Sequence, residues 1–563
     1  MKKTTFRTAF MVLILLQLLL IFYYGTQKAG FHEDEYFSYF SPNRSVGFYY
    51  VDREWVRTDT LMREFAVVPG EGFRFDQVRI FTSWDTHPPL FYDLIHLACS
   101  LTPWLFTKWQ GIAVNMVGFV LVQLLLAALC KQLSCSKSGE QRARALALLC
   151  CASYGFLPGA VTGVILIRMY EYLTAAFLLS LLFHVRIIRS HERRSFLTAL
   201  TGAALATFLG FLTQYFYILL LAPAGVFTAL FLLLRHRREG IRKGLREAFA
   251  YGFSQALALG LTVLYYPWSM AHIFGGYRGD DVASDFFDIS NTLDRLALFG
   301  RLLTRFGFAG LLPLMLLPVV LFVLCLMRKT AKNKTAVGSA SADHATEDCA
   351  GTDVDIAGYL LCLFSSLGYF FLVSKVGLIL GFPSFRYVLP LVPLCVLFSL
   401  LAVRGLLDLL PAGGSPSRSA LLRRCAFLAA AAVFTLSCIK GIAEKDVLFL
   451  YREDVEKVAF AREHKDLPVV IIYNNSTPYN IWRLTNELFE HDALYYMNPD
   501  NLSPLEDETI LASDDLLVYV ADSHTADDML RLVAESGTKA PRRITHVFQE
   551  DMWNLYELSR PAP

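Results

Sequence analysis

The sequence predicts an all-α polytopic membrane protein with about eleven transmembrane helices and a small C-terminal α/β domain outside the membrane. Of its 563 residues, 55% are hydrophobic and only 18% are charged, which leaves too few polar residues to cover a soluble protein of this size. Residues 441–563 differ, because they carry 11 Lys and Arg against 23 Asp and Glu. We therefore expect two domains, a transmembrane domain over 1–440 and a soluble acidic domain over 441–563.

The first apolar run, 8–24, follows Lys2, Lys3 and Arg7. No small-residue cleavage site follows it, so we expect an uncleaved membrane helix rather than a signal peptide. Ten further apolar runs are long enough to span a bilayer. They lie near 110–130, 145–165, 169–187, 196–213, 215–234, 248–271, 307–327, 355–374, 386–403 and 424–440.

Clusters of Lys and Arg occupy alternate connections between these runs. They fall within 131–144, 186–194, 235–246, 328–334 and 404–424. By the positive-inside rule these connections and the N-terminus are cytoplasmic. The acidic C-terminal domain is then extracytoplasmic, which predicts a multi-pass protein of the cell membrane.

The apolar stretch 88–106 does not fit this alternation. It contains Asp93 and His96, each of which costs a few kcal/mol at the bilayer centre. If it spanned the membrane alone, every later basic cluster would move to the wrong side. We expect it to lie in the outer interface or to enter the membrane only partway.

The remaining segments are connections and the tail. We expect outer loops over 26–107 and 272–306 and a flexible cytoplasmic loop over 328–353. In the tail, strand-like runs at 469–473, 493–497, 516–521 and 544–548 alternate with helical patterns at 478–489 and 526–535, which is typical of a small α/β domain. All 11 cysteines lie between Cys99 and Cys438, and no disulfide framework or zinc site is indicated.

Two polar motifs lie in the first outer loop. Directly after the first helix come three consecutive carboxylates, Glu33, Asp34 and Glu35. They could act as a general base, bind a divalent cation, or simply be solvated. The second motif places Asp85 and His87 before a double proline, which by itself indicates only the start of a helix.

Together these motifs resemble the GT-C class of membrane glycosyltransferases, which includes protein O-mannosyltransferases and aminoarabinose transferases, and most closely its bacterial RgtA/B/C/D-like branch. The class has an acidic pair after the first helix and a His-Pro-Pro-Leu-like motif before the second spanning helix. The segments that carry the resemblance are 31–39, 85–92, 212–217, 272–279 and 386–390. One departure is Gln214, where a His is expected, so the resemblance implies no proton transfer there.

The resemblance implies an outward-facing site that takes a sugar from a polyprenyl-phosphate donor, and the predicted topology places all five segments on the outer face. Asp34 and Glu35 are the expected catalytic carboxylates, with Asp34 as the base. Arg278 and Arg386, and also Arg168, are candidates to contact the donor phosphate, although each could instead be an interfacial anchor. The remaining expected donor- or substrate-binding residues are Asp85, His87, Tyr215, His272 and Tyr387.

The expected activity is an inverting transfer of a hexosyl or pentosyl group to an acceptor hydroxyl of a lipid, glycan or protein of the cell envelope. No cofactor is required, although Asp34, Glu35 and Asp85 could hold Mg²⁺ or Mn²⁺. A polytopic transporter or lipid flippase is the alternative, but we see neither charged residues in mid-membrane nor paired halves. No basic stripe suggests nucleic-acid binding.

Overall fold

The computed structural model describes residues 1–44, 51–134, 139–237, 240–275, 286–336, 352–409, 416–523, 525–550 and 552–561. It divides into two compact units. Unit 1 comprises Met1–Gly25, Thr82–Phe91 and Gly111–Leu448, and unit 2 comprises Thr26–Phe81, Tyr92–Gln110 and Phe449–Pro563. The predicted class, a mostly helical membrane protein with a small α/β part, is confirmed.

Within the described residues, ten helices are long and apolar enough to cross a membrane. They are α1 (Lys3–Gln27), α6 (Lys108–Leu133), α9 (Tyr170–Arg189), α10 (Arg193–Thr213), α11 (Tyr217–Arg235), α12 (Ile241–Tyr265), α16 (Leu312–Ala336), α17 (Ile356–Val376), α18 (Leu391–Leu409) and α19 (Pro416–Ala443). An eleventh span is formed if α7 (Glu140–Gly155) and α8 (Pro158–Ile165), which meet at a bend of 65°, count as one. Pro158 at the start of α8 explains the break, since its ring disfavours a helical conformation at the preceding residue.

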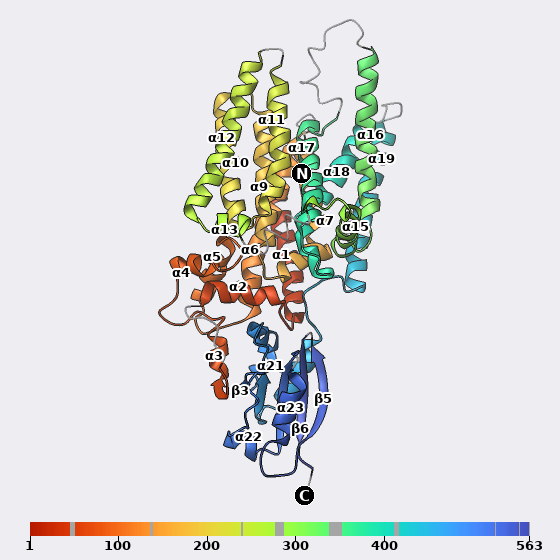
Figure 1. The fold of residues 1–563 in the computed structure, drawn as a ribbon. Helices are drawn as coiled ribbons and strands as arrows, with labels where there is room; N and C mark the ends of the chain where they lie inside the picture. The colour runs from red at the N-terminus through yellow and green to blue at the C-terminus, as the bar shows by residue number, and fades with distance from the viewer. Residues whose placement is uncertain are drawn as a thin grey trace. The chain divides into compact units, whose positions relative to one another are not determined.

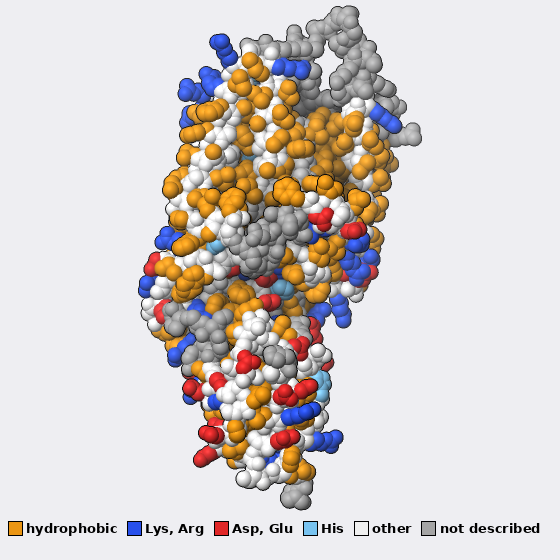
Figure 2. Space-filling model, in the orientation of Figure 1, with side chains coloured by type: hydrophobic (Ala, Val, Ile, Leu, Met, Phe, Trp, Pro, Cys, Tyr) orange, Lys and Arg blue, Asp and Glu red, His pale blue; other side chains and the backbone are white. Residues whose placement is uncertain are grey.

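The helices of unit 1 pack side by side (Figure 1), with α10 between α9 and α12 and with α11 against α17. Close packing depends on small residues. A Cβ at Gly202 of α10 would lie 2.1 Å from the Phe183 ring of α9, and one at Gly405 of α18 would lie 2.3 Å from the Phe322 ring of α16. Figure 2 shows hydrophobic side chains over the visible face of these helices and Lys and Arg towards their ends, as expected for helices that face lipid.

Short elements connect the long helices at the end of unit 1 where α12 ends and α18 begins. They are α13 (Ser269–Phe274), α15 (Thr292–Leu302), the π-helix η2 (Leu303–Gly307) and the 3₁₀ helix η4 (Phe382–Val388). The expected outer loop 272–306 therefore contains helical structure, although 276–285 lies outside the described residues.

The apolar stretch 88–106 contains helix α5 (Leu90–Ser100), which has 11 residues. At about 1.5 Å per residue this helix is roughly 16 Å long, about half of the hydrocarbon thickness of a bilayer. It is too short to span the membrane by itself, as the charge pattern predicted.

Unit 2 is built on a six-stranded sheet in the order β1-β3-β2-β4-β6-β5. Strand β2 pairs in parallel with β3 and β4, whereas β1, β6 and β5 pair antiparallel with their neighbours. The strands are β1 (Glu54–Arg57), β2 (Val469–Ile472), β3 (Ala493–Met497), β4 (Asp515–Ala521), β5 (Arg543–Glu550) and β6 (Trp553–Ser559). The helical elements of the unit include α2 (Glu33–Asn43), α3 (Thr58–Met62), α4 (Phe75–Thr82), α20 (Asp454–Glu463), η5 (Pro478–Leu484), α21 (Thr485–Leu488), α22 (Glu508–Ala512) and α23 (Ala526–Glu535).

The structure corrects the predicted boundary at residue 441. Strand β1 comes from the first outer loop and pairs with β3 of the tail, so this part of the loop and the tail share one sheet. A side-chain contact supports the same grouping, because Trp482 Nε1 donates to Glu64 Oε2 at 2.7 Å. Most of the loop, Thr26–Phe81 and Tyr92–Gln110, therefore folds with the tail, whereas Thr82–Phe91 belongs to unit 1. The sequence carries no sign of this because more than 300 residues separate the loop from the tail.

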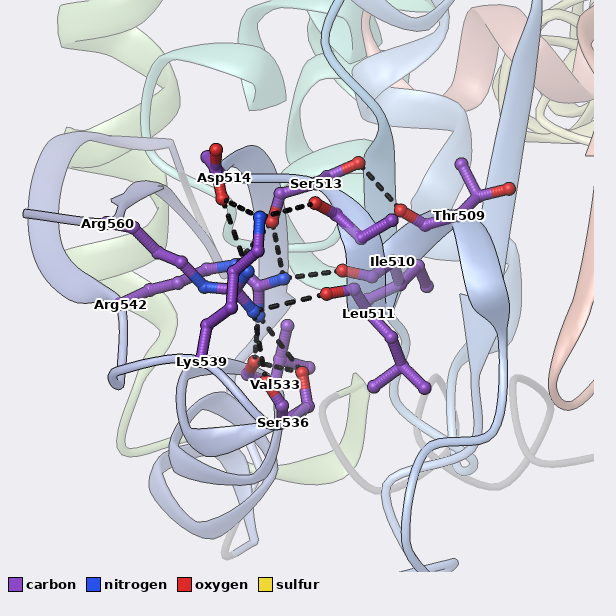
Figure 3. Close-up of polar contacts among 11 residues, drawn as sticks. Thr509, Ile510, Leu511, Ser513, Asp514, Val533, Ser536, Lys539, Arg542 and Arg560 are labelled. Carbon is purple, nitrogen blue, oxygen red and sulfur yellow. Dashed lines mark hydrogen bonds and ion pairs between the residues drawn. The ribbon is translucent and has the colours of Figure 1, made fainter. Parts of the chain in front are cut away.

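Two buried arginines bind the ends of helices in unit 2 (Figure 3). Arg542, which is 4% exposed, donates to Ile510 O and Ser513 O at the end of α22, at 2.5 and 2.7 Å. It also donates to Val533 O at the end of α23, at 2.9 Å. Its neighbour Arg560 donates to Leu511 O at 3.2 Å. The last carbonyls of a helix have no partner within that helix, so these guanidinium groups hold the two helix ends together.

Arg542→Ala is expected to destabilise unit 2 by about 3 kcal/mol or more, because several buried carbonyls lose a charged donor. Arg543→Ala is the matched control, since Arg543 is the next residue and its side chain is exposed. Hydrogen exchange of the full-length protein should show faster exchange in α22 and α23 for Arg542→Ala only. If α22 and α23 exchanged at the same rate in both variants, Arg542 would not be the residue that holds these helix ends.

Asp93 on α5 is partly buried in unit 2, and its Oδ1 has no hydrogen-bond partner among the described residues. Burial raises the pKa of Asp93 to about 7, and Arg79 opposes this shift. Since the carboxyl of an unfolded chain titrates near about pH 4, the folded protein retains a proton that the unfolded chain releases. The stability contributed by this group is therefore lost as the pH rises from about 4 to about 7.

Asp93→Asn is expected to remove this pH dependence. At pH 8 the variant should be more stable than the wild type by about 2 kcal/mol, with solvent screening taken into account, whereas at pH 4 the two should be similar. Thermal unfolding of the full-length protein at both pH values measures the difference. Asp76→Asn is the control, since Asp76 is exposed and paired with Arg74. If Asp76→Asn increased the stability at pH 8 as much as Asp93→Asn does, burial of Asp93 would not be the cause of the pH dependence.

Candidate active site

The acidic run forms the first turn of α2 in unit 2. His32 precedes the helix, and its Nδ1 accepts a hydrogen bond from the backbone N–H of Asp34 at 3.1 Å. In return, Glu35 Oε2 accepts from the backbone N–H of His32 at 2.6 Å. This reciprocal arrangement is a capping box, and it explains why the helix begins at this point in the sequence.

Glu35 is fully buried and also accepts a hydrogen bond from Lys28 Nζ at 2.8 Å. Lys28 is buried as well and donates to Phe449 O at 2.7 Å, so it links the end of the first helix to the tail within unit 2. Burial lowers the pKa of Lys28, and Glu35 opposes that shift. Because Glu35 is held by Lys28 and by the backbone of His32, its side chain fixes the position of α2.

Asp34 has a different environment. Its side chain is 28% exposed, and its Oδ2 lies 3.4 Å from His32 Nδ1. Glu33, the residue before it, is exposed. Of the two carboxylates predicted to be catalytic, Asp34 is thus the one whose side chain solvent can reach, while Glu35 is held by a buried ion pair.

In unit 1, three of the predicted residues form a chain of polar contacts. Arg168 Nη2 lies 3.2 Å from His87 Nε2, and His87 Nδ1 lies 3.2 Å from Asp85 Oδ1. A guanidinium can only donate, so His87 Nε2 accepts and the proton of the neutral ring is on Nδ1, where it is donated to Asp85. The contacts orient Arg168, which is 3% exposed, through the imidazole.

A second chain of contacts joins Tyr215 and His272. The Tyr215 hydroxyl lies 3.0 Å from His272 Nδ1, and His272 Nε2 lies 3.1 Å from Ser83 O. A carbonyl oxygen only accepts, so Nε2 carries the proton and the tyrosine hydroxyl donates to Nδ1. His272 therefore bridges the segments of Tyr215 and Ser83.

Gln214 follows the last residue of α10, and its Oε1 accepts a hydrogen bond from Tyr215 N at 2.7 Å, so it holds the turn before α11.

Arg386 and Tyr387 lie on η4, and both are buried. The guanidinium of Arg386 lies 5.1 Å from the centre of the Tyr387 ring, and its Nη2 donates to the Tyr387 hydroxyl at 3.2 Å. Tyr369 of α17 donates to Tyr387 O at 2.7 Å, which fixes the backbone of η4 against a membrane helix.

Aromatic contacts connect these groups. The Tyr387 ring lies 6.1 Å from Tyr170, two residues after Arg168, and 5.3 Å from Phe216, the residue after Tyr215. Unit 1 thus brings together all of its described predicted residues, which are Asp85, His87, Arg168, Tyr215, His272, Arg386 and Tyr387. Arg278 lies outside the described residues.

Sequence reasoning missed three residues that hold predicted site residues or their segments in place, Lys28 in unit 2 and Tyr266 and Tyr369 in unit 1. Lys28 pairs with Glu35, Tyr369 holds η4, and the Tyr266 hydroxyl donates to Thr82 Oγ1 at 3.1 Å. The contacts join residues 7, 18 and 184 positions apart. No local motif surrounds any of them, so the sequence alone offered no signal.

The carboxylates proposed for a metal do not fit that role. No group of three or more His, Cys, Asp or Glu side chains that could hold a metal ion is found within the described part of the chain. Glu35 is occupied by Lys28 and by the His32 backbone, and Asp85 Oδ1 accepts from Thr86 N at 2.6 Å as well as contacting His87. We therefore derive no step that uses a metal.

Neither a protein-family model nor a curated protein matches the sequence. Among solved structures, the chain is similar to ArnT from Cupriavidus metallidurans bound to undecaprenyl phosphate, at 11% identity and a TM-score of 0.48, with 97% of each chain covered. It is also similar to the archaeal oligosaccharyltransferase AglB from Archaeoglobus fulgidus in complex with an inhibitory peptide and a dolichol-phosphate. In that case the identity is 12% and the TM-score 0.44, and the match covers 87% of this chain and 64% of the other. These likenesses concern the course of the chain, and the chemistry of the site rests on this chain's own residues.

Proposed function

We propose that this protein is an integral membrane glycosyltransferase that moves a sugar from a polyprenyl-phosphate-linked donor to an acceptor hydroxyl on the outer face of the membrane. The observation that carries the proposal is the cluster in unit 1 where Arg168 and Arg386, both buried, come together with polar and aromatic side chains from five separate segments. Buried arginines at the ends of membrane helices suit a lipid-linked phosphate.

The arginines supply the leaving-group half of the reaction. When the bond between the anomeric carbon and the phosphate oxygen breaks, that oxygen keeps the electron pair and negative charge grows on it. Guanidinium groups held in place by His87 and by Tyr387 would stabilise this charge without rearranging, which lowers the barrier more than it tightens ground-state binding.

Asp34, in the first turn of α2 in unit 2, is the proposed general base. In a single displacement the acceptor oxygen forms a bond to the anomeric carbon while the phosphate leaves from the opposite side, so the configuration inverts. The proton of the acceptor hydroxyl passes to the Asp34 carboxylate. Its exposure to solvent and its hydrogen-bonded position on α2 support this role, whereas Glu35 is proposed to hold α2 in place.

The proposed topology has a cytoplasmic N-terminus and an extracytoplasmic unit 2. The clusters of Lys and Arg in the connections support it. Those within the described residues lie at the helix ends opposite to the ends that carry the candidate site residues of unit 1. For example, Arg189 and Arg193 flank the connection from α9 to α10, whereas Arg168 precedes α9 and Tyr215 follows α10.

The test is to supply the purified full-length protein in lipid vesicles with radiolabelled polyprenyl-phosphate sugars and an envelope extract as acceptor. A glycosyltransferase consumes one donor and transfers the label to the extract. A flippase or transporter would move the intact lipid between leaflets with no transfer. Translocation of every donor without transfer of label would refute the proposal.

A further inference from the structure

A cavity unrelated to the cluster above lies within unit 1 between α7, α18 and α19. Its volume is about 1040 Å³. It is formed by the start of α7, the end of α18 and the start of α19, whereas Arg386 and Tyr387 precede α18. The length of α18, 19 residues or roughly 28 Å, therefore separates the cavity from the candidate active site.

One end of the cavity is basic. Four arginines line it, Arg142, Arg404, Arg423 and Arg424, against one carboxylate, Asp408. Asp408 Oδ1 lies 3.1 Å from Arg423, and Arg404 pairs with Asp353 at 2.6 Å. In the part of the chain that the structure describes, neither Arg142 nor Arg424 forms an ion pair.

The deeper wall is apolar. Leu149 lies seven residues after Arg142 on α7, and Ala431 lies seven residues after Arg424 on α19, so on both helices the wall extends about 10 Å below the arginines. Phe427 and Leu428 complete this part of the lining. A ligand that fits has an anionic head and a hydrocarbon chain.

We propose that this cavity binds an anionic phospholipid of the surrounding membrane. Its phosphate lies between Arg142 and Arg424, and an acyl chain follows Leu149 and Phe427 towards Ala431. Unpaired guanidinium groups at the membrane surface are stabilised by lipid phosphate, and basic pockets between membrane helices on the positively charged side are suited to acidic headgroups. The lipid would fill the gap between α7, α18 and α19.

The test measures binding of phosphatidylglycerol and phosphatidylcholine to the delipidated full-length protein by native mass spectrometry. The double variant Arg142→Ala/Arg424→Ala should bind phosphatidylglycerol about 10-fold more weakly or worse. The matched control, Arg193→Ala/Arg194→Ala, removes two exposed arginines from the start of α10 at the same end of unit 1 and should change binding less than about twofold. Phosphatidylcholine should bind weakly and equally to all three proteins.

A second variant tests the cavity without changing charge. Ala431→Trp fills the apolar wall and should weaken phosphatidylglycerol binding as much as the double alanine variant does. If the alanine variant does not fold, Arg142→Lys/Arg424→Lys keeps the charge but loses the planar donor geometry, and its binding should fall between the wild type and Ala431→Trp. Normal binding by Ala431→Trp, or an equal loss in the Arg193/Arg194 control, would overturn the proposal.

Discussion

Asp34→Asn is expected to lower turnover by about 100-fold or more, because the amide keeps the size of the side chain but cannot accept a proton from the acceptor hydroxyl. Donor binding should change little, since the proposed phosphate contacts are arginines of unit 1. The change should not disturb α2, because the cap uses the backbone N–H of Asp34 and not its carboxylate.

The neighbouring carboxylates provide the controls. Glu33→Gln changes an exposed residue of the same turn and should leave turnover near that of the wild type. Glu35→Gln removes the charge that Lys28 needs in its buried position, so it should reduce the amount of folded protein rather than turnover per folded molecule. Turnover and donor affinity measured per folded molecule separate the three variants. Near-normal turnover of Asp34→Asn would remove this residue from the role of base.

The membrane helices could be predicted because their signal is local. An apolar run of about 20 residues must satisfy its backbone within itself, so hydropathy alone located the ten spans and the bent pair of α7 and α8. Strands β2 to β5 were also predicted, since each contains a short run of β-branched or aromatic residues, whereas β6 was not predicted. Strand β1 was not, because its four residues carry no pattern and it is ordered by pairing with β3, more than 400 residues away.

In the candidate site, too, the local sequence pointed to residues but not to their surroundings. The resemblance to GT-C motifs pointed to Asp34, Asp85, His87 and Arg386 as candidates, because those motifs are short stretches of local sequence. Their environments could not be predicted. Three adjacent carboxylates look alike in sequence, yet Glu33 is exposed, Asp34 is partly exposed and Glu35 is buried and paired with Lys28. Which of them faces the interior depends on the packing of the folded chain around α2.

Arg386→Ala is expected to lower turnover per folded molecule by about 10- to 100-fold, the loss expected when a buried guanidinium no longer contacts a phosphate. Arg386→Lys should retain part of the activity, since the charge remains but the planar donor and the contact with the Tyr387 hydroxyl are lost. The loss should be larger in kcat than in donor affinity if the charge acts mainly at the transition state.

Arg295 provides the matched control for this prediction. It is as buried as Arg386, at 5% exposed, but its guanidinium donates to two backbone carbonyls at the end of α17, Ser374 O at 2.8 Å and Gly377 O at 2.5 Å. Arg295→Ala should therefore lower the stability and the yield of folded protein, while the molecules that fold should work at a normal rate. If Arg386 were only an anchor of η4, its alanine variant would behave in the same way. Reduced yield together with normal turnover for Arg386→Ala would thus exclude it from phosphate binding and leave Arg168 as the remaining described candidate.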